Sequence, residues 1–462
     1  MNNASFLSKQ TLIKYKIEII IFLTVFIVYS FFTFLKILNH LPVQNLAADQ
    51  YFQIANNLIN SSIFSLDGLS PTALRMPGYP FFLTILFRIF HNWWAILLVQ
   101  NMISALTALF IYLISKKWLS FGYAITASFI WALEPYAIDS SQQFLTETLY
   151  TFILVSSVLF FLKYKDFIGK KIFITSILGL MLAILTYIKP VSLFLPIIYA
   201  LSLIKNNFSK KTFIQITSLL FVYIALLFPW AFRNYSLFGS WQLSADNASS
   251  FYITILDFQA KKEGIGTGPS DIPAQSEFPK FAESGNLSKT NQEFQRGISF
   301  VISNSFSFSK FYSKKLIKSV TVTSWWGSIR NSIMGKAGEA NYHNKVNNAL
   351  INFDWGEISN FSSKEIVAAI IMIFGAIFWA IILLLSFIGV IYLFKISPLE
   401  TRPVLILSVG IIAYLILSAN LAAPSAMPRY RLPASPFMII FAITGFSYLI
   451  KKISPFGQPP AE

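Results

Sequence analysis

The chain has 462 residues, of which 55% are hydrophobic and 12% are charged, and its mean hydropathy is +0.60. Soluble domains carry about 25% charged residues, so a polytopic membrane protein is expected. The absence of cysteine excludes disulfides, thiol nucleophiles and thiolate metal sites, and the three histidines argue against a His-rich metal centre. The net charge of +16 is interpreted as basic cytoplasmic loops that meet anionic lipid, not as a nucleic-acid surface.

Apolar runs near 20 residues predict about ten membrane spans. They lie at 17–38, 93–115, 120–138, 144–162, 172–188, 190–204, 212–231, 366–394, 403–419 and 436–450. The first run lacks a small-residue cleavage site, so it is expected to remain as a span and not to be a cleaved signal peptide. The shorter segment 79–90 is expected to lie at the membrane interface.

Lysine and arginine gather in alternate short loops and in both tails, which predicts cytoplasmic termini. The expected organisation has three parts. They are a transmembrane catalytic module at 1–231 with an outer loop at 39–92, a small extracytoplasmic subdomain at 232–362, and C-terminal spans with a short cytoplasmic tail at 363–462. No internal repeat is found, so a transporter built on inverted repeats gains no support.

The stretch NLAADQYFQIANNL begins the first outer loop at Asn45. Its apolar residues follow helical spacing, which predicts an interfacial helix with an uncharged polar face. Those residues are Tyr51, Ile54, Ala55, Leu58 and Ile59. Asp49 stands at the start, where a carboxylate is favoured as a helix cap. Pattern alone leaves open whether Asp49 caps the helix or takes part in chemistry.

Other charged residues fall at the outer ends of predicted spans. Glu147 lies near the start of the fourth span, where carboxylates tend to be functional, whereas Asp139 in the preceding turn is expected to be solvated. Cations on the outer face oppose the orientation bias, and Arg and Lys suit the binding of a phosphate. These cations are Lys189, Arg233, Arg429 and Arg431. Arg75 lies in the first outer loop, where it is either an anion contact or an anchor that snorkels to the interface.

Acids and cations on one membrane face fit one reaction. A phosphate that links a sugar to a lipid is a competent leaving group, and it needs charge neutralisation and not a proton. The acceptor hydroxyl or amine needs a general base, which a carboxylate can be. A second carboxylate can help to hold a divalent ion or the acceptor. No nucleotide-binding loop is seen in the sequence.

Six segments together resemble the GT-C glycosyltransferases, specifically the bacterial group similar to protein mannosyltransferases and aminoarabinose transferases. In chain order they are ADQYFQIANNLI, RMPGYPFFL, LTETLY, YIKP, FPWAFRNYSLFG and RYRLPASP. The resemblance covers most of the chain. It implies a GT-C-like bundle of about ten or more transmembrane helices with interfacial helices.

The resemblance also implies roles for individual residues. The acidic residue of the first outer loop, here Asp49, is a catalytic base or a metal-associated carboxylate. Family members often carry two adjacent acids there, and in this chain Gln50 follows Asp49. Glu147, with Asp139 as the alternative, matches the acid of the second outer loop. Lys189 matches a lipid-phosphate contact, and Arg75, Arg429 and Arg431 are weaker matches of the same kind.

The sequence thus predicts an inverting transferase of the cytoplasmic (inner) membrane, with its active site on the extracytoplasmic side. The donor is a polyprenyl-phosphate sugar and the acceptor a glycan, lipid or protein. Asp49 is the base, Glu147 the second carboxylate, and a divalent ion held by both is a further expectation. Three alternatives stay open: a transporter or flippase for lipid-linked glycans, a non-catalytic envelope scaffold, and a glycan polymerase or ligase that uses a diphosphate donor.

Overall fold

A computed structural model of the protein describes residues 2–47, 49–168, 172–204, 209–246, 297–321, 325–334, 354–398, 401–421 and 428–453, with single residues and short pieces between 251 and 350. The elements in these ranges are helices, apart from one isolated bridge between Ser65 and Pro71. The predicted class, a polytopic α-helical membrane protein, is confirmed.

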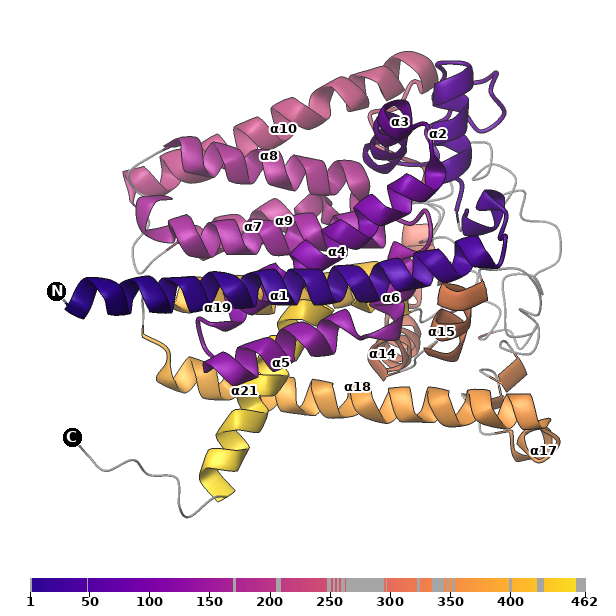
Figure 1. The fold of residues 1–462 in the computed structure, drawn as a ribbon. Helices are drawn as coiled ribbons and strands as arrows, with labels where there is room; N and C mark the ends of the chain where they lie inside the picture. Colours follow the sequence, from indigo (N-terminus) through magenta and orange to yellow (C-terminus); the bar gives the residue numbers. More distant parts are fainter. Residues whose placement is uncertain are drawn as a thin grey trace.

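Helices of 9 to 37 residues, most of which run along the bundle, form its body (Figure 1). They are α1 (Asn2–Leu38), α4 (Trp93–Ser115), α5 (Phe121–Ala132), α7 (Glu147–Ile168), α8 (Ile172–Ile188), α9 (Leu195–Leu203), α10 (Lys210–Phe238), α18 (Ser363–Ile396), α19 (Arg402–Leu421) and α21 (Ser435–Ile453). Within the described ranges, five segments are long and apolar enough to cross a membrane: Lys16–Leu38 of α1, α4, Glu147–Tyr164 of α7, α10 and α18.

One predicted span is divided. The run 120–138 was expected to be continuous, but α5 ends at Ala132 and a separate short helix, α6 (Pro135–Ser141), follows. The carboxylate of Glu134 accepts a hydrogen bond from the Ala137 amide and caps α6, and Pro135 occupies its first turn. Both features favour the start of a new helix over the continuation of α5.

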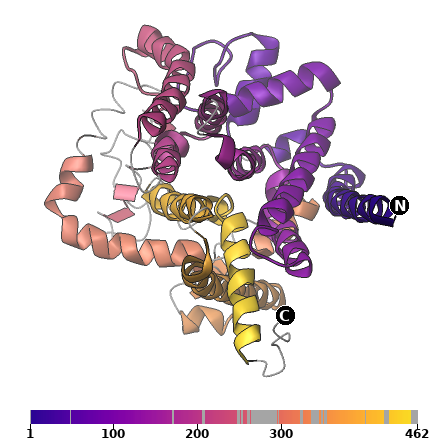
Figure 2. The same cartoon turned by 90° about the vertical axis from the view of Figure 1, so that its left-hand side faces the viewer.

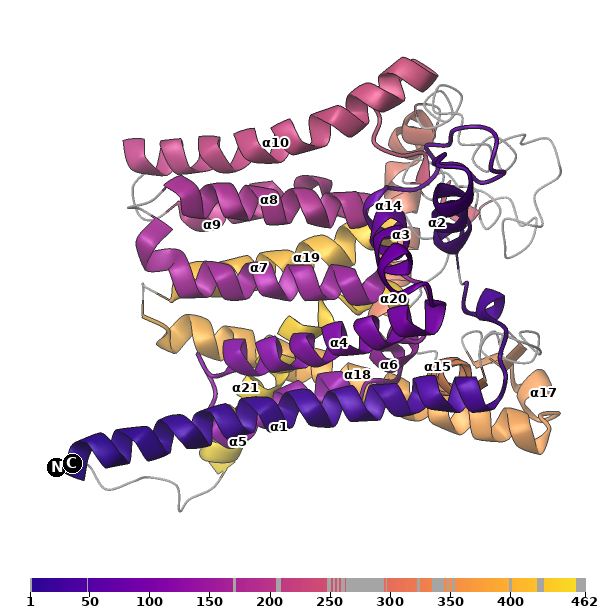
Figure 3. The same cartoon turned by 45° about the horizontal axis from the view of Figure 1, so that its top comes forward.

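The shorter elements lie mostly at the end of the bundle opposite the N-terminus. Figures 1 and 3 show α2, α3, α6, α15 and α20 at this end. The bounds of the short elements are η1 (Val43–Leu46), α2 (Tyr51–Asn60), α3 (Gly78–Phe90), η2 (Pro190–Phe194), α14 (Ser305–Thr321), α15 (Trp325–Met334), α17 (Trp355–Ile358) and α20 (Pro428–Arg431).

Close packing of α18 against α21 depends on glycine. A Cβ atom on Gly389 would lie 1.9 Å from the carbonyl oxygen of Phe441, and one on Gly445 would lie 2.2 Å from that of Leu385. Small residues allow helix backbones to approach closely where the lipid supplies no hydrophobic driving force. Figure 2, viewed from the end that carries the N-terminus, shows α1 nearly end-on and α21 along its length beside α18.

The predicted helix after the first span is confirmed as α2, and of the two roles left open for Asp49 the structure does not support the helix cap. Gln50 and not Asp49 is the N-cap residue, and it makes no side-chain capping bond. Asp49 lies one residue further out, and its carboxylate contacts arginine side chains instead. Parts of the predicted subdomain 232–362, among them 247–250 and 263–294, lie outside the described residues. The three-part organisation and the membrane orientation stay predictions.

Candidate functional site

Glu147 is the centre of a group of charged side chains. It is the first residue of α7, and its side chain is fully enclosed. Its Oε1 atom accepts hydrogen bonds from Lys189 Nζ at 2.8 Å and from Arg429 Nε at 3.0 Å. Lys189 follows the end of α8, and Arg429 belongs to α20, so three distant segments converge on one carboxylate oxygen.

Arg429 also reaches Asp49. Its Nη2 atom donates to Asp49 Oδ2 at 3.2 Å, so a single guanidinium joins the two carboxylates. The side chain of Asp49 is 19% exposed, whereas that of Glu147 has no exposed surface. Of the two acids, Asp49 is the one that an incoming molecule can reach.

Arg75 completes this group from the other side of Asp49. Its Nη2 atom lies 3.8 Å from Asp49 Oδ1, and Nε and Nη2 donate to Gln50 Oε1 at 3.0 and 2.6 Å. The guanidinium carbon stands 5.2 Å from the centre of the Tyr51 ring, a cation–π arrangement. We call Asp49, Arg75, Glu147, Lys189 and Arg429 the charge cluster.

Backbone contacts fix the loops that carry the charge cluster. The Phe144 amide donates to the Leu46 carbonyl at 3.0 Å, which joins the turn before Glu147 to the loop before Asp49. Gly78 lies so close to the end of α8 that a Cβ atom there would be 2.7 Å from the Tyr187 carbonyl. The loop of Arg75 is therefore packed directly against the segment that presents Lys189.

A buried polar network lies behind the turn that leads to Glu147. The Gln142 carbonyl accepts from Lys36 Nζ at 2.7 Å, and its side-chain amide bonds Thr33 and Asn101 at 2.7 and 2.8 Å. Buried polar groups that are satisfied in this way rigidify their surroundings. The network anchors the turn to α1 and α4, and so restricts where Glu147 can lie.

Asp246 is a member of the site that the sequence reasoning missed. Its Oδ1 atom accepts from Arg75 Nη1 at 2.7 Å. In the structure α10 ends at this face of the bundle, and Asp246 follows its last residue by eight positions. Nothing in the local pattern distinguishes this acid from a solvated loop residue.

Burial and neighbouring charges perturb the cations. Burial lowers the pKa of the Lys189 ammonium from its ordinary 10.5, and the Glu147 carboxylate opposes this shift without cancelling it. For Arg429, burial acts in the same direction, but Glu147, Tyr430 and Asp49 together raise its pKa well above the ordinary value. The guanidinium therefore stays charged, whereas the ammonium is the titratable cation of the charge cluster.

Two predicted phosphate-binding residues lie apart from these contacts. Arg233 donates from Nη1 to the Thr72 carbonyl at 2.8 Å, and its guanidinium stacks 4.6 Å from the Trp230 ring centre. Arg431 is buried, with its guanidinium 3.8 Å from the ring centre of Trp379 on α18. Their roles in phosphate binding stay predictions.

Asp139 was expected to be solvated, and this is wrong, because it is 3% exposed and accepts a bond from Gln143.

The expected divalent ion also stays a prediction. In the part of the chain that the structure describes, no three His, Cys, Asp or Glu side chains are grouped as a metal site. The oxygens of Asp49 and Glu147 are bridged by Arg429, which does not suit a shared metal ligand set.

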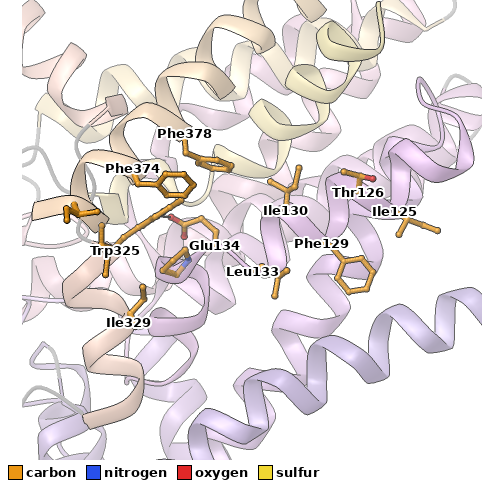
Figure 4. Close-up of a pocket in the computed structure, with 13 residues that line it drawn as sticks. Ile125, Thr126, Phe129, Ile130, Leu133, Glu134, Trp325, Ile329, Phe374 and Phe378 are labelled. Carbon is orange, nitrogen blue, oxygen red and sulfur yellow. Dashed lines mark hydrogen bonds between the residues drawn. The ribbon is translucent and has the colours of Figure 1, made fainter. Parts of the chain in front are cut away.

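An apolar cavity of about 850 Å³ lies between α5, α15 and α18. Ile130, Ile329, Phe374 and Phe378 are among its lining residues (Figure 4). At the end where α6 begins, Glu134 accepts a hydrogen bond from Trp325 Nε1 at 3.0 Å. From there α6 and the following turn lead to Glu147. The cavity is suited to a hydrocarbon chain.

Residues 73–232 match the model of the dolichyl-phosphate-mannose-protein mannosyltransferase family. The resemblance predicted from the sequence is confirmed over this range. The match contains Arg75, Glu147 and Lys189, and it ends one residue before Arg233. Asp49, Asp246 and Arg429 lie outside it. No curated protein is significantly similar to the chain.

Proposed function

We propose that this protein, a membrane glycosyltransferase of the GT-C type, moves a sugar from a polyprenyl-phosphate donor to a hydroxyl or amine of a glycan, lipid or protein. The observation that carries the proposal is the Arg429 bridge between Asp49 and Glu147. It places a reachable carboxylate beside cations from three further segments of the chain.

The cations suit the leaving group. Lys189, Arg75 and Arg429 present charged N–H donors, which form the strongest hydrogen bonds to phosphate oxygens. The lipid phosphate gains negative charge as the sugar departs, and preorganised cations in a partly buried site stabilise that charge. Glu147 holds Lys189 and Arg429 in place and is a positioning residue in this scheme, since its own side chain is enclosed.

Asp49 is the base. The acceptor oxygen or nitrogen attacks the anomeric carbon from the face opposite the phosphate, and its proton passes to the Asp49 carboxylate. The electron pair of the broken carbon–oxygen bond stays on the phosphate, which leaves as a lipid phosphate. A single displacement inverts the anomeric carbon.

The cavity between α5, α15 and α18 supports a lipid-linked substrate. Its walls are apolar, and it ends where α6 begins. Helix α6 and the turn after it separate this end of the cavity from Glu147 in the sequence. In this proposal the lipid chain lies along the cavity while the phosphate reaches the charge cluster. The site faces the extracytoplasmic side of the cytoplasmic membrane, and both termini are cytoplasmic, as the loop charges predict.

The test is a transfer assay on the purified full chain with radiolabelled polyprenyl-phosphate sugars and envelope extract. Asp49→Asn is expected to slow transfer by about 10²–10⁴-fold, the usual contribution of a general base. Asp67→Asn is the matched control, because Asp67 is exposed and its carboxylate accepts from the amides of its own turn, Leu69 and Ser70. Equal transfer by wild type and Asp49→Asn would remove Asp49 from the mechanism.

A further inference from the structure

Asp246 is built into the site by its backbone. The neighbouring Ala245 amide donates to the Ala73 carbonyl at 2.9 Å, and Ala245 packs with Ala73 and Leu74 in a small buried cluster. This bond joins the loop of Arg75, at Ala73, to the segment that carries Asp246. The Asp246–Arg75 pair at 2.7 Å is a product of this docking and not of two free side chains.

The end of α10 fixes the same segment from the other side. Trp230 Nε1 donates to the Leu243 carbonyl at 2.8 Å, and Asn234 Nδ2 donates to the Gln242 carbonyl at 2.8 Å. Both donors belong to α10. The position of Asp246 is therefore determined by a membrane helix and by the loop of Arg75 together.

Asp246 balances the charge of the site. The charge cluster has three cations, Arg75, Lys189 and Arg429, against two carboxylates, Asp49 and Glu147. Asp246 is the third carboxylate, and it makes the formal charge of the group zero. The side chains of Arg75 and Asp246 are 15% and 26% exposed, so their field is only partly screened by water.

Asp246 also occupies the edge of Arg75 that a phosphate would need. The Nε and Nη2 atoms of Arg75 are directed to Gln50, and Nη1 is directed to Asp246. A phosphate that approaches the Nη1 N–H bonded to Asp246 competes with that carboxylate. The exchange is between two anions at one donor.

We propose that Asp246 is a counterion of Arg75 that limits how tightly the site binds lipid phosphate. This inference rests on the proposed function. Binding that is equally strong for substrate and product lowers KM without raising kcat, and slow product release then limits turnover. By competing for Arg75, Asp246 keeps the lipid-phosphate product releasable.

The experiment measures equilibrium binding of a short-chain polyprenyl phosphate, and of the uncharged polyprenol, to the full chain in phosphatidylcholine nanodiscs. Asp246→Asn is expected to bind the phosphate about tenfold more tightly than wild type, or about 1.4 kcal/mol. Its affinity should also fall more steeply with salt, because one more net positive charge faces the ligand. Asp246→Glu keeps the charge and is expected to match wild type.

Two comparisons complete the design. Polyprenol binding is expected to be equal in wild type and both variants, which shows that the lipid site is folded. Asp67→Asn removes one exposed acid of the first outer loop and is expected to leave phosphate affinity unchanged. Phosphate binding by Asp246→Asn that is equal to or weaker than wild type overturns the inference. A wild type that does not prefer polyprenyl phosphate to polyprenol instead contradicts the proposed function itself.

Discussion

The Nε atom of Arg429 donates to Oε1 of Glu147 at 3.0 Å across 282 positions of sequence. Through Nη2 the same guanidinium also contacts Asp49. The C-terminal part of the chain therefore closes a site whose carboxylates Asp49 and Glu147 come from the segment before α2 and from the start of α7. Removal of the Arg429 side chain leaves Asp49 and Glu147 without the cation that they share.

Arg429→Lys is expected to reduce transfer nearly as much as Arg429→Gln, by about 100-fold. The guanidinium uses two separate nitrogens to join two carboxylates, and an ammonium on a flexible stem cannot reproduce that geometry. The measurement is kcat with a saturating lipid-phosphate sugar. Arg88→Gln, which removes an exposed arginine of α3, should retain wild-type transfer. Full activity in Arg429→Lys would show that charge alone suffices.

Glu147→Gln is expected to destabilise the protein as well as inactivate it. The change leaves the buried Lys189 and the partly buried Arg429 with one fewer counterion. Loss of one partner from a buried ion pair costs about 3–5 kcal/mol. The double variant Glu147→Gln/Lys189→Met removes one cation together with the acid. It should recover much of the thermal stability in detergent, while transfer stays absent. Recovery of transfer in the double variant would contradict the role of Lys189 at the phosphate.

Several features of the site could be predicted from the sequence because alternate loops of a membrane bundle share a face. Asp49 and Lys189 fall in such loops and Glu147 near the start of a span, and their charge is unusual beside apolar segments. The structure brings these three together with Arg75 and Arg429. Their chemical roles are still predictions, but their proximity is now a structural observation.

The sequence could not determine which arginine of the RYR stretch joins the site. Arg429 and Arg431 are two positions apart, and the choice depends on how α20 packs: Arg431 lies against Trp379, and Arg429 contacts Glu147. Asp246 was missed for a related reason, since its partner Arg75 is 171 positions away. Contacts of this kind arise from tertiary packing, which local patterns do not encode.

The pH dependence of transfer should reflect Lys189. Burial lowers the pKa of this ammonium below 10.5, so its charge is lost, and transfer falls, as pH rises through the lowered value. The folded pKa lies below the unfolded one, so in that window the unfolded chain binds more protons and this group's contribution to stability rises with pH. The activity loss is therefore not an unfolding event. Rates measured from neutral pH upward should decline in wild type, whereas Lys189→Arg, which cannot deprotonate in this range, should lack the decline.

Gly78→Ala is expected to lower activity although it substitutes no charged residue. A Cβ atom at this position would lie 2.7 Å from the carbonyl carbon and oxygen of Tyr187, so the loop of Arg75 must move away from the end of α8. Overpacking of this kind costs about 1–3 kcal/mol. We expect a lower melting temperature and a fall in kcat, because Arg75 and Lys189 lie on either side of the contact. Gly122→Ala in α5 is the matched control, since nothing lies within 4 Å of the added Cβ atom. If both variants melt and react like wild type, the close approach of Gly78 to α8 does not position the site.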